Sequence, residues 1–195
     1  MSATPWPVSD GGVYGDEWPV VAALADFRRR EGLPDDGGVT APTVSYPVGP
    51  WHVTIPNFAS RRRALELHDM QHLATGYATD WAGESQIAAW ELGSGCGRFI
   101  APWFLAGGAF SVGVWLYPQM TWTAFVRGRR SLSLYRNPDA TRLKDGTLGA
   151  MRQAMTLPRA RPQSRAADVV WYVVASLPML TLVGVLAGGV RAWLA

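Results

Sequence analysis

The chain has 195 residues, which is enough for one domain with short appendages and too few for two domains of ordinary size. Its single cysteine, Cys96, excludes a disulfide within the chain, and we expect it to be a small buried residue. The net charge is only +3, but residues 127–165 carry ten basic and two acidic side chains. Aromatic residues are not interleaved with these arginines as stacking on bases requires. The pattern therefore argues against nucleic acid and favours an anionic membrane surface.

Residues 1–57 are predicted to form an N-terminal arm and loop region with one short helix. Residues 1–19 are polar and rich in glycine and proline, as irregular segments are. Residues 20–31 place apolar side chains on one helical face, and Gly32 stops this helix. Residues 34–56 contain many glycines and prolines and predict a long connection into which no regular helix fits. His52 lies there without a motif partner, so we expect a structural or surface histidine rather than a metal ligand.

Two helices are predicted next, joined by a turn at residues 75–77. Ser60 is a good N-cap for the first helix, and three arginines follow it. Because Arg61, Arg62 and Arg63 oppose the helix dipole, anionic headgroups or a substrate carboxylate are candidate partners for them beside water. The second helix should run from residue 79 or 80 to Trp90 and end at the glycine-rich residues 93–97.

These two helices carry the pattern that points to chemistry. His68 and His72 are four residues apart, so they lie on the same helical face and can reach one cation. Glu84, on the returning helix, can supply an oxygen ligand, and Glu91 shares its face two turns later. Asp69 is a candidate ligand, a partner that orients an imidazole, or a group that transfers a proton. A histidine pair of this spacing also arises by chance, but the acidic neighbours favour a metal site.

The same residues resemble the signature of the ubiquinone (coenzyme Q) biosynthesis family usually called Coq-four, which is His-Asp-x-x-His, eleven residues, and Glu. Every fixed position is present as His68, Asp69, His72 and Glu84. The resemblance covers roughly residues 58–157. The neighbouring matches are Thr75-Gly76-Tyr77 before the turn, Gly83 before the glutamate, the Trp90-Glu91 pair, and a later stretch from Trp122 to Gly128-Arg129.

This resemblance implies an all-helical domain that acts on polyprenylated ring precursors at a membrane. It implies a divalent metal, usually taken as zinc, held by His68, Asp69, His72 and Glu84, with Asp69 and Glu84 as catalytic acid/base candidates. The implied reaction removes the ring carboxyl during ubiquinone synthesis, with or without hydroxylation of the same carbon. Hydroxylation needs an electron acceptor, and no glycine motif for a flavin or nicotinamide is present. Molecular oxygen with a redox-active metal would serve, whereas zinc alone would not.

Residues 99–126 contain no charged side chain over 28 positions, which is long enough to cross a bilayer. Prolines and glycines interrupt this stretch, so three interpretations stay open: a membrane span, a segment lying on or re-entering the membrane, and the apolar wall of a tunnel for a prenyl chain. A single span would put Arg129 and the metal residues on opposite sides of the membrane. We therefore favour a pair of membrane-embedded or tunnel-lining helices.

Residues 127–157 predict a helix, a turn at residues 137–139 and a second helix. Arg129 and Arg130 are candidate contacts for a carboxylate or phosphate of the substrate, and a solvated basic face is the other interpretation. Residues 158–168 form a basic linker. Residues 169–190 have 22 positions without a charge and are the clearest transmembrane candidate. More arginines precede than follow them, which predicts a single-pass C-terminal anchor with the domain on the cytoplasmic face of the inner (plasma) membrane.

The sequence therefore predicts an all-α protein with a helical metal-binding domain, an apolar membrane-associated segment and a C-terminal transmembrane helix. The leading function is metal-dependent decarboxylation, oxidative or not, of a polyprenylated hydroxybenzoate ring, with Zn²⁺ as the expected metal. The alternative is a non-catalytic membrane-anchored subunit that binds a quinone or prenyl lipid, as a homodimer or within a larger membrane complex. A zinc hydrolase is a third interpretation, weakened because Asp69 stands where such enzymes carry the longer glutamate.

Overall fold

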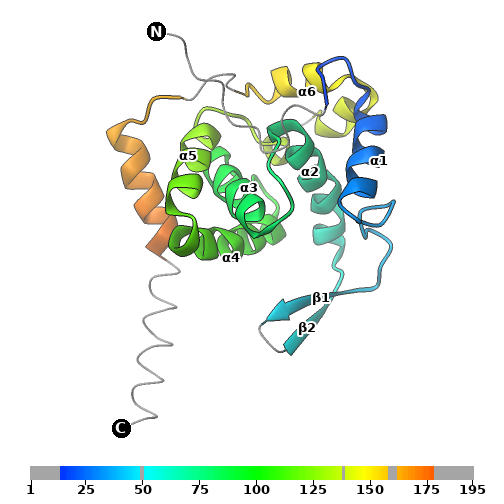
Figure 1. Cartoon of the computed structure of the whole chain (residues 1–195), viewed down its shortest axis with the longest axis horizontal. Helices are drawn as coiled ribbons and strands as arrows, with labels where there is room; N and C mark the ends of the chain where they lie inside the picture. Colours follow the sequence, from blue (N-terminus) through cyan, green and yellow to red (C-terminus); the bar gives the residue numbers. More distant parts are fainter. Residues whose placement is uncertain (1–13, 49–50, 138, 158–161, 178–195) are drawn as a thin grey trace.

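A computed structural model describes residues 14–48, 51–137, 139–157 and 162–177, and this part of the chain is mostly helical (Figure 1). The predicted all-α class is thus confirmed in its main feature. Residues 166–177 form a further helix, which lies beside α5. The elements in chain order are α1 (Val20–Arg30), β1 (Thr43–Val48), β2 (Trp51–Pro56), α2 (Ala59–Thr75), α3 (Trp81–Ser94), α4 (Ile100–Leu116), α5 (Pro118–Gly128), the 3₁₀ turns η1 (Leu134–Arg136) and η2 (Ala140–Asp145), and α6 (Leu148–Ala154).

A β-hairpin occupies part of the segment for which the sequence predicts only an irregular connection. Strands β1 and β2 pair antiparallel, with Thr43 opposite Pro56 and Val48 opposite Trp51. The glycines and prolines of this segment argued against regular structure. Both strands of a two-stranded sheet are edge strands, however, and Pro47 is tolerated in an edge strand. The hairpin projects away from the helices (Figure 1).

Helix α2 begins two residues earlier than predicted, because its N-cap is Phe58 rather than Ser60. It ends where predicted, because Gly76 adopts the left-handed conformation with φ 75° and donates its backbone N–H to the His72 carbonyl at 2.8 Å. Asp80 caps α3, and its carboxylate accepts the Gly83 N–H at 2.7 Å. These two caps fix the turn that returns the chain toward the α2 histidines.

Helix α3 packs against both α4 and α5. It extends to Ser94, beyond the predicted end at Trp90. The crossing with α5 is close because glycines meet there: the Cβ position of Gly93 lies 3.3 Å from the Gly128 Cα. Trp90 is fully buried at this crossing. The position of α3, and therefore of its two glutamates, depends on this contact.

The uncharged residues 99–126 form the predicted pair of helices, α4 and α5, which separate at Tyr117 and Pro118. Among the described residues, no helix is both long enough and apolar enough to cross a membrane. Of the predicted span of residues 169–190, the structure describes residues 169–177, which belong to the helix of residues 166–177. The rest of that span lies outside the described residues. Because this helix begins at residue 166, it includes residues 166–168, which were predicted to belong to the linker of residues 158–168.

The region after α5 corrects the predicted helix–turn–helix of residues 127–157. Helix α5 ends at Gly128, and the short turns η1 and η2 follow in place of a first long helix. The Ser133 hydroxyl accepts the Tyr135 N–H at 3.0 Å, a local bond that competes with continued helix. Only α6 corresponds to the second predicted helix.

Candidate metal centre

Helices α2 and α3 bring His68, His72 and Glu84 together. The two imidazole Nε2 atoms are 3.1 Å apart. Glu84 Oε1 lies 3.4 Å from Nε2 of His72, and Glu84 Oε2 lies 3.7 Å from Nε2 of His68. One ligand atom from each residue falls within 4.8 Å of the others, so the three can share a metal ion. The spacing of four along α2 and the capped turn into α3 produce this arrangement.

The outer nitrogen of each imidazole is held by a separate acceptor. His72 Nδ1 donates to the backbone carbonyl of Tyr77 at 2.9 Å, and His68 Nδ1 donates to Oε1 of Glu91 at 2.8 Å. A carbonyl or carboxylate oxygen can only accept, so the proton of each neutral ring belongs on Nδ1. Both Nε2 lone pairs therefore point into the group, which is the tautomer that a metal-ligating histidine needs.

The donor set fits a cation. The Nε2 lone pairs of His68 and His72 repel one another when the two nitrogens are 3.1 Å apart, and the nearby negative charge of Glu84 adds to the repulsion. A proton or a metal ion among the three groups removes this repulsion. Burial alone would raise the pKa of Glu84, but its contacts with His68 and His72 hold that pKa well below its usual range. Burial alone would lower the pKa of His68, but Glu91 and Glu84 raise it well above the usual value. The site thus favours positive charge among these three residues.

The group opens to solvent on one side. The His72 side chain is only 2% exposed, whereas those of His68 and Glu84 are 26% and 35% exposed. His72 also stacks on Phe27 of α1, with ring centroids 6.1 Å apart. A small molecule can therefore approach from the side of His68 and Glu84, while α1 closes the opposite side.

Asp69 is not brought into this group. Its Oδ2 accepts from Nε of Arg28 at 2.8 Å and lies 2.8 Å from a second nitrogen of that guanidinium, and both side chains are buried. Gly37, with φ 66°, covers the ion pair so closely that a Cβ there would lie 2.6 Å from the carboxylate. Burial raises the pKa of Asp69 although Arg28 opposes that change. The roles predicted for Asp69, as a ligand, as a partner that orients an imidazole or as a proton-transfer group, remain predictions.

Arg129 and Arg130 contact a carboxylate of the chain itself. Arg130 binds Asp168 at 2.5 Å, and Arg129 lies 3.4 Å from the same side chain. The two arginines thereby hold the helix of residues 166–177 against the end of α5. Their predicted role as substrate contacts remains a prediction. His52, on β2, is exposed, and Cys96 is buried as expected.

Two residues that support the site, Gln71 and Tyr135, have no signal in the sequence pattern. Both donate to Glu91, while Tyr77, a residue of the predicted turn, holds His72 through its backbone carbonyl. Glu91 was predicted to share the face of Glu84 and belongs to the Trp90-Glu91 match, but its hydrogen-bond partners were not predicted. Arg127 adds support from α5, because it donates to the Thr75 carbonyl at 2.9 Å and lies over the Tyr77 ring.

Comparisons of the chain with protein-family models, with curated proteins and with solved structures found no match.

Proposed function

We propose that the chain is a metal-dependent enzyme, resembling the Coq-four family, that removes the carboxyl group of a polyprenylated hydroxybenzoate during ubiquinone synthesis. The observation that carries this proposal is the meeting of His68, His72 and Glu84 with their ligand atoms within 4.8 Å of one another. Both Nε2 lone pairs are directed inward by hydrogen bonds at Nδ1. This is the residue set of the signature, in a geometry suited to one divalent cation.

In this proposal His68, His72 and Glu84 hold the metal. When bound, the metal would act as a Lewis acid that polarises the ring hydroxyl or carboxylate, so that the negative charge left on the ring as carbon dioxide leaves is stabilised. The carbon–carbon bond to the carboxyl breaks, and a proton takes its place on the ring. Two imidazoles and one carboxylate leave further positions on zinc for water or a substrate oxygen. The exposed edge formed by His68 and Glu84 is the side from which the ring would approach.

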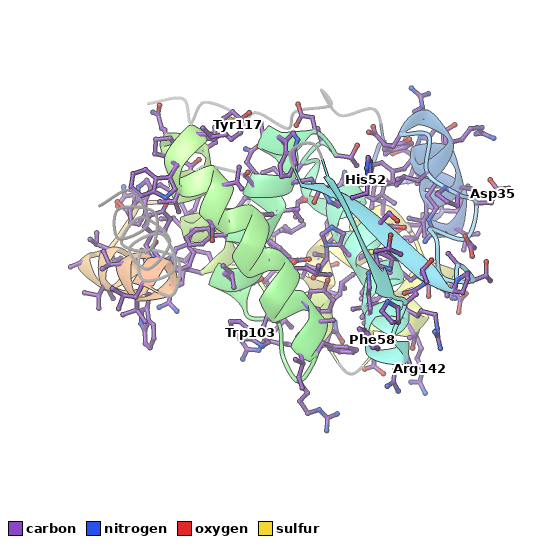
Figure 2. The ribbon with its side chains drawn as sticks, turned by 90° about the horizontal axis from the view of Figure 1, so that it is seen from below. Asp35, His52, Phe58, Trp103, Tyr117 and Arg142 are labelled. Carbon is purple, nitrogen blue, oxygen red and sulfur yellow. The ribbon has the colours of Figure 1, made fainter. Side chains whose placement is uncertain are left out.

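The apolar surface of α4 supports a membrane or prenyl-lipid partner. This helix has no charged residue, and several of its large apolar side chains are exposed. They are Ile100, Trp103, Leu105, Trp115 and Leu116. Helix α4 and the hairpin lie on the same face of the molecule, with Trp103 and Tyr117 near the two ends of the helix (Figure 2). Tryptophan near the ends of an uncharged apolar helix is typical of a lipid interface.

The non-catalytic alternative is favoured by a different observation. The helix of residues 166–177 exposes Val169, Val170, Trp171, Val173 and Val174, so it offers a second apolar surface that is separate from the metal residues. A membrane-anchored subunit of a larger assembly would use such a surface to hold a protein partner or a quinone. The complete set of metal residues favours the enzyme.

The deciding experiment is metal analysis of the purified full chain together with a carbon dioxide assay. The variant His68→Ala/His72→Ala removes two ligands, and His52→Ala is the matched control because His52 is exposed on the hairpin. We expect about one metal ion per chain in wild type and control, and none in the double variant. Wild type and control should release labelled carbon dioxide from the carboxyl-labelled polyprenylated hydroxybenzoate, and chelation of the metal should abolish the release.

Wild-type protein without metal, or full release from the double variant, would contradict the proposal. Metal that binds as expected without any release of carbon dioxide, in a chain that purifies with a larger membrane assembly, would instead support the non-catalytic alternative.

A further inference from the structure

Glu91 is the most enclosed charged group near the metal residues. It lies on α3 and is only 2% exposed. One of its oxygens, Oε1, accepts three hydrogen bonds: from His68 Nδ1 at 2.8 Å, from Gln71 Nε2 at 2.8 Å and from the Tyr135 hydroxyl at 3.0 Å. Gln71 and Tyr135 are neutral donors. A buried carboxylate with neutral donors is costly unless a positive charge lies near it.

The two donors besides His68 are themselves fixed by the fold. The Gln71 side-chain oxygen accepts the backbone N–H of Leu134 at 2.9 Å, so its amide group is held at both ends. Burial and the neighbouring Glu91 raise the pKa of Tyr135 well above its usual value, so its hydroxyl keeps its proton and donates. Glu91 therefore cannot turn away from His68 without leaving two buried donors unpaired.

We infer that Glu91 is a positioning residue for the metal, acting through His68, and that Gln71 and Tyr135 hold it in that role. This inference rests on the proposed metal site. The Glu91 carboxylate fixes the proton of His68 on Nδ1 and directs the Nε2 lone pair at the cation. It also makes Nε2 more basic and therefore a stronger ligand for the metal. Together with Glu84 it supplies two negative charges, which balance one divalent cation. Asp69 does not contribute to this balance because Arg28 neutralises it.

The test uses Glu91→Gln in the full chain. This variant keeps the size of the side chain but removes its charge. Glu66→Gln is the matched control: Glu66 also lies on the metal-site helices, but it pairs with Lys144 at 3.2 Å and its side chain is 38% exposed. Affinity for Zn²⁺ is measured by competition with a chromophoric chelator. We expect Glu91→Gln to weaken binding roughly ten- to hundredfold and Glu66→Gln to leave it unchanged.

A second measurement separates positioning from a general effect on folding. Nitrogen-15 NMR of the labelled histidines reports which nitrogen of each ring carries the proton. In the zinc-loaded wild type we expect His68 protonated at Nδ1 and bound through Nε2, and in Glu91→Gln a loss of that single protonation pattern. Because this measurement is informative on wild type alone, it tests the inference even if Glu91→Gln does not fold.

Wild-type affinity in Glu91→Gln, or His68 bound to zinc through Nδ1, would overturn the inference while leaving the metal site itself intact. Absence of zinc binding in the wild type would overturn both the inference and the metal proposal. Release of carbon dioxide is not measured in either experiment, so failure of the proposed reaction is detected separately.

Discussion

At the scale of single residues, the charged side chains near His68 and His72 form two neighbouring but separate groups. Glu84 and Glu91 face the two histidines, and Asp69, next to His68 in the sequence, turns instead to Arg28 of α1. The ion pair of Arg28 and Asp69 joins α1 to α2 next to the candidate metal ligands of α2. Breaking such a pair leaves an uncompensated buried charge, which costs more than the pair itself contributes.

We therefore predict that Arg28→Ala lowers the free energy of unfolding by about 3–5 kcal/mol. The neighbouring Arg29→Ala is the control, because Arg29 is 72% exposed and pairs with Asp26 at the surface. Its effect should stay within about 1 kcal/mol. Urea unfolding followed by circular dichroism measures both. Equal losses in the two variants would mean that Asp69 does not depend on Arg28.

At the scale of elements, the crossing of α3 and α5 sets where Glu84 and Glu91 stand relative to α2. The crossing has no room for a side chain at either glycine. A Cβ added at Gly128 would overlap the Trp90 carbonyl oxygen, and one added at Gly93 would overlap the Phe125 carbonyl oxygen. Because these neighbours are backbone atoms of rigid helices, they cannot move aside as a flexible side chain would.

Gly128→Ala should therefore destabilise the protein by about 1–3 kcal/mol, despite the better helix propensity of alanine. Gly108→Ala, on α4, is the matched control, since among the described residues no atom beyond the neighbouring helix backbone lies within 4 Å of its Cβ position. That control should be neutral or stabilising by up to about 1 kcal/mol. Thermal unfolding of the two variants compares them. A Gly128→Ala variant that unfolds at the wild-type temperature would show that α3 and α5 can move apart at this crossing with little loss of stability.

At the scale of the whole molecule, the helix of residues 166–177 is joined to the rest by charges at one point and by aromatic packing along its side. Asp168 accepts the Arg165 backbone N–H and contacts Arg129 and Arg130. Burial alone would raise the pKa of Asp168, but hydrogen bonds from the Arg130 side chain, the Arg165 backbone and the Arg129 side chain lower that pKa. Further along the helix, the Tyr172 ring meets Phe110, Trp122 and Phe125 edge-on.

Docking of this helix should consequently depend on pH. A lowered pKa means that the docked state prefers the charged carboxylate, so its contribution is complete above the ordinary aspartate pKa of about 4 and is lost as the pH falls through the lowered value. Hydrogen-exchange protection of residues 166–177, corrected for intrinsic rates, should fall over that range. Asp168→Asn should reduce it already at neutral pH, whereas Asp139→Asn, in an exposed ion pair, should not. Unchanged protection in Asp168→Asn would show that the aromatic contacts alone hold the helix.

The sequence by itself determined the local geometry of the candidate site. The spacing of His68 and His72 places both rings on one helical face because an α-helix has 3.6 residues per turn. Gly76 and Asp80 end one helix and begin the next because one tolerates a positive φ and the other caps free N–H groups. Those signals act over a few residues, so they were sufficient to predict that Glu84 returns to the histidines.

Only the tertiary structure decided which distant groups those residues meet. Asp69 pairs with a residue 41 positions earlier, and Glu91 accepts a hydrogen bond from a residue 44 positions later. Periodicity fixes the face of a helix on which a side chain lies, but it does not say which other element covers that face. The choice of partner depends on how α1, α3 and η1 pack around α2, because a buried charge takes whichever donors the packing brings within reach.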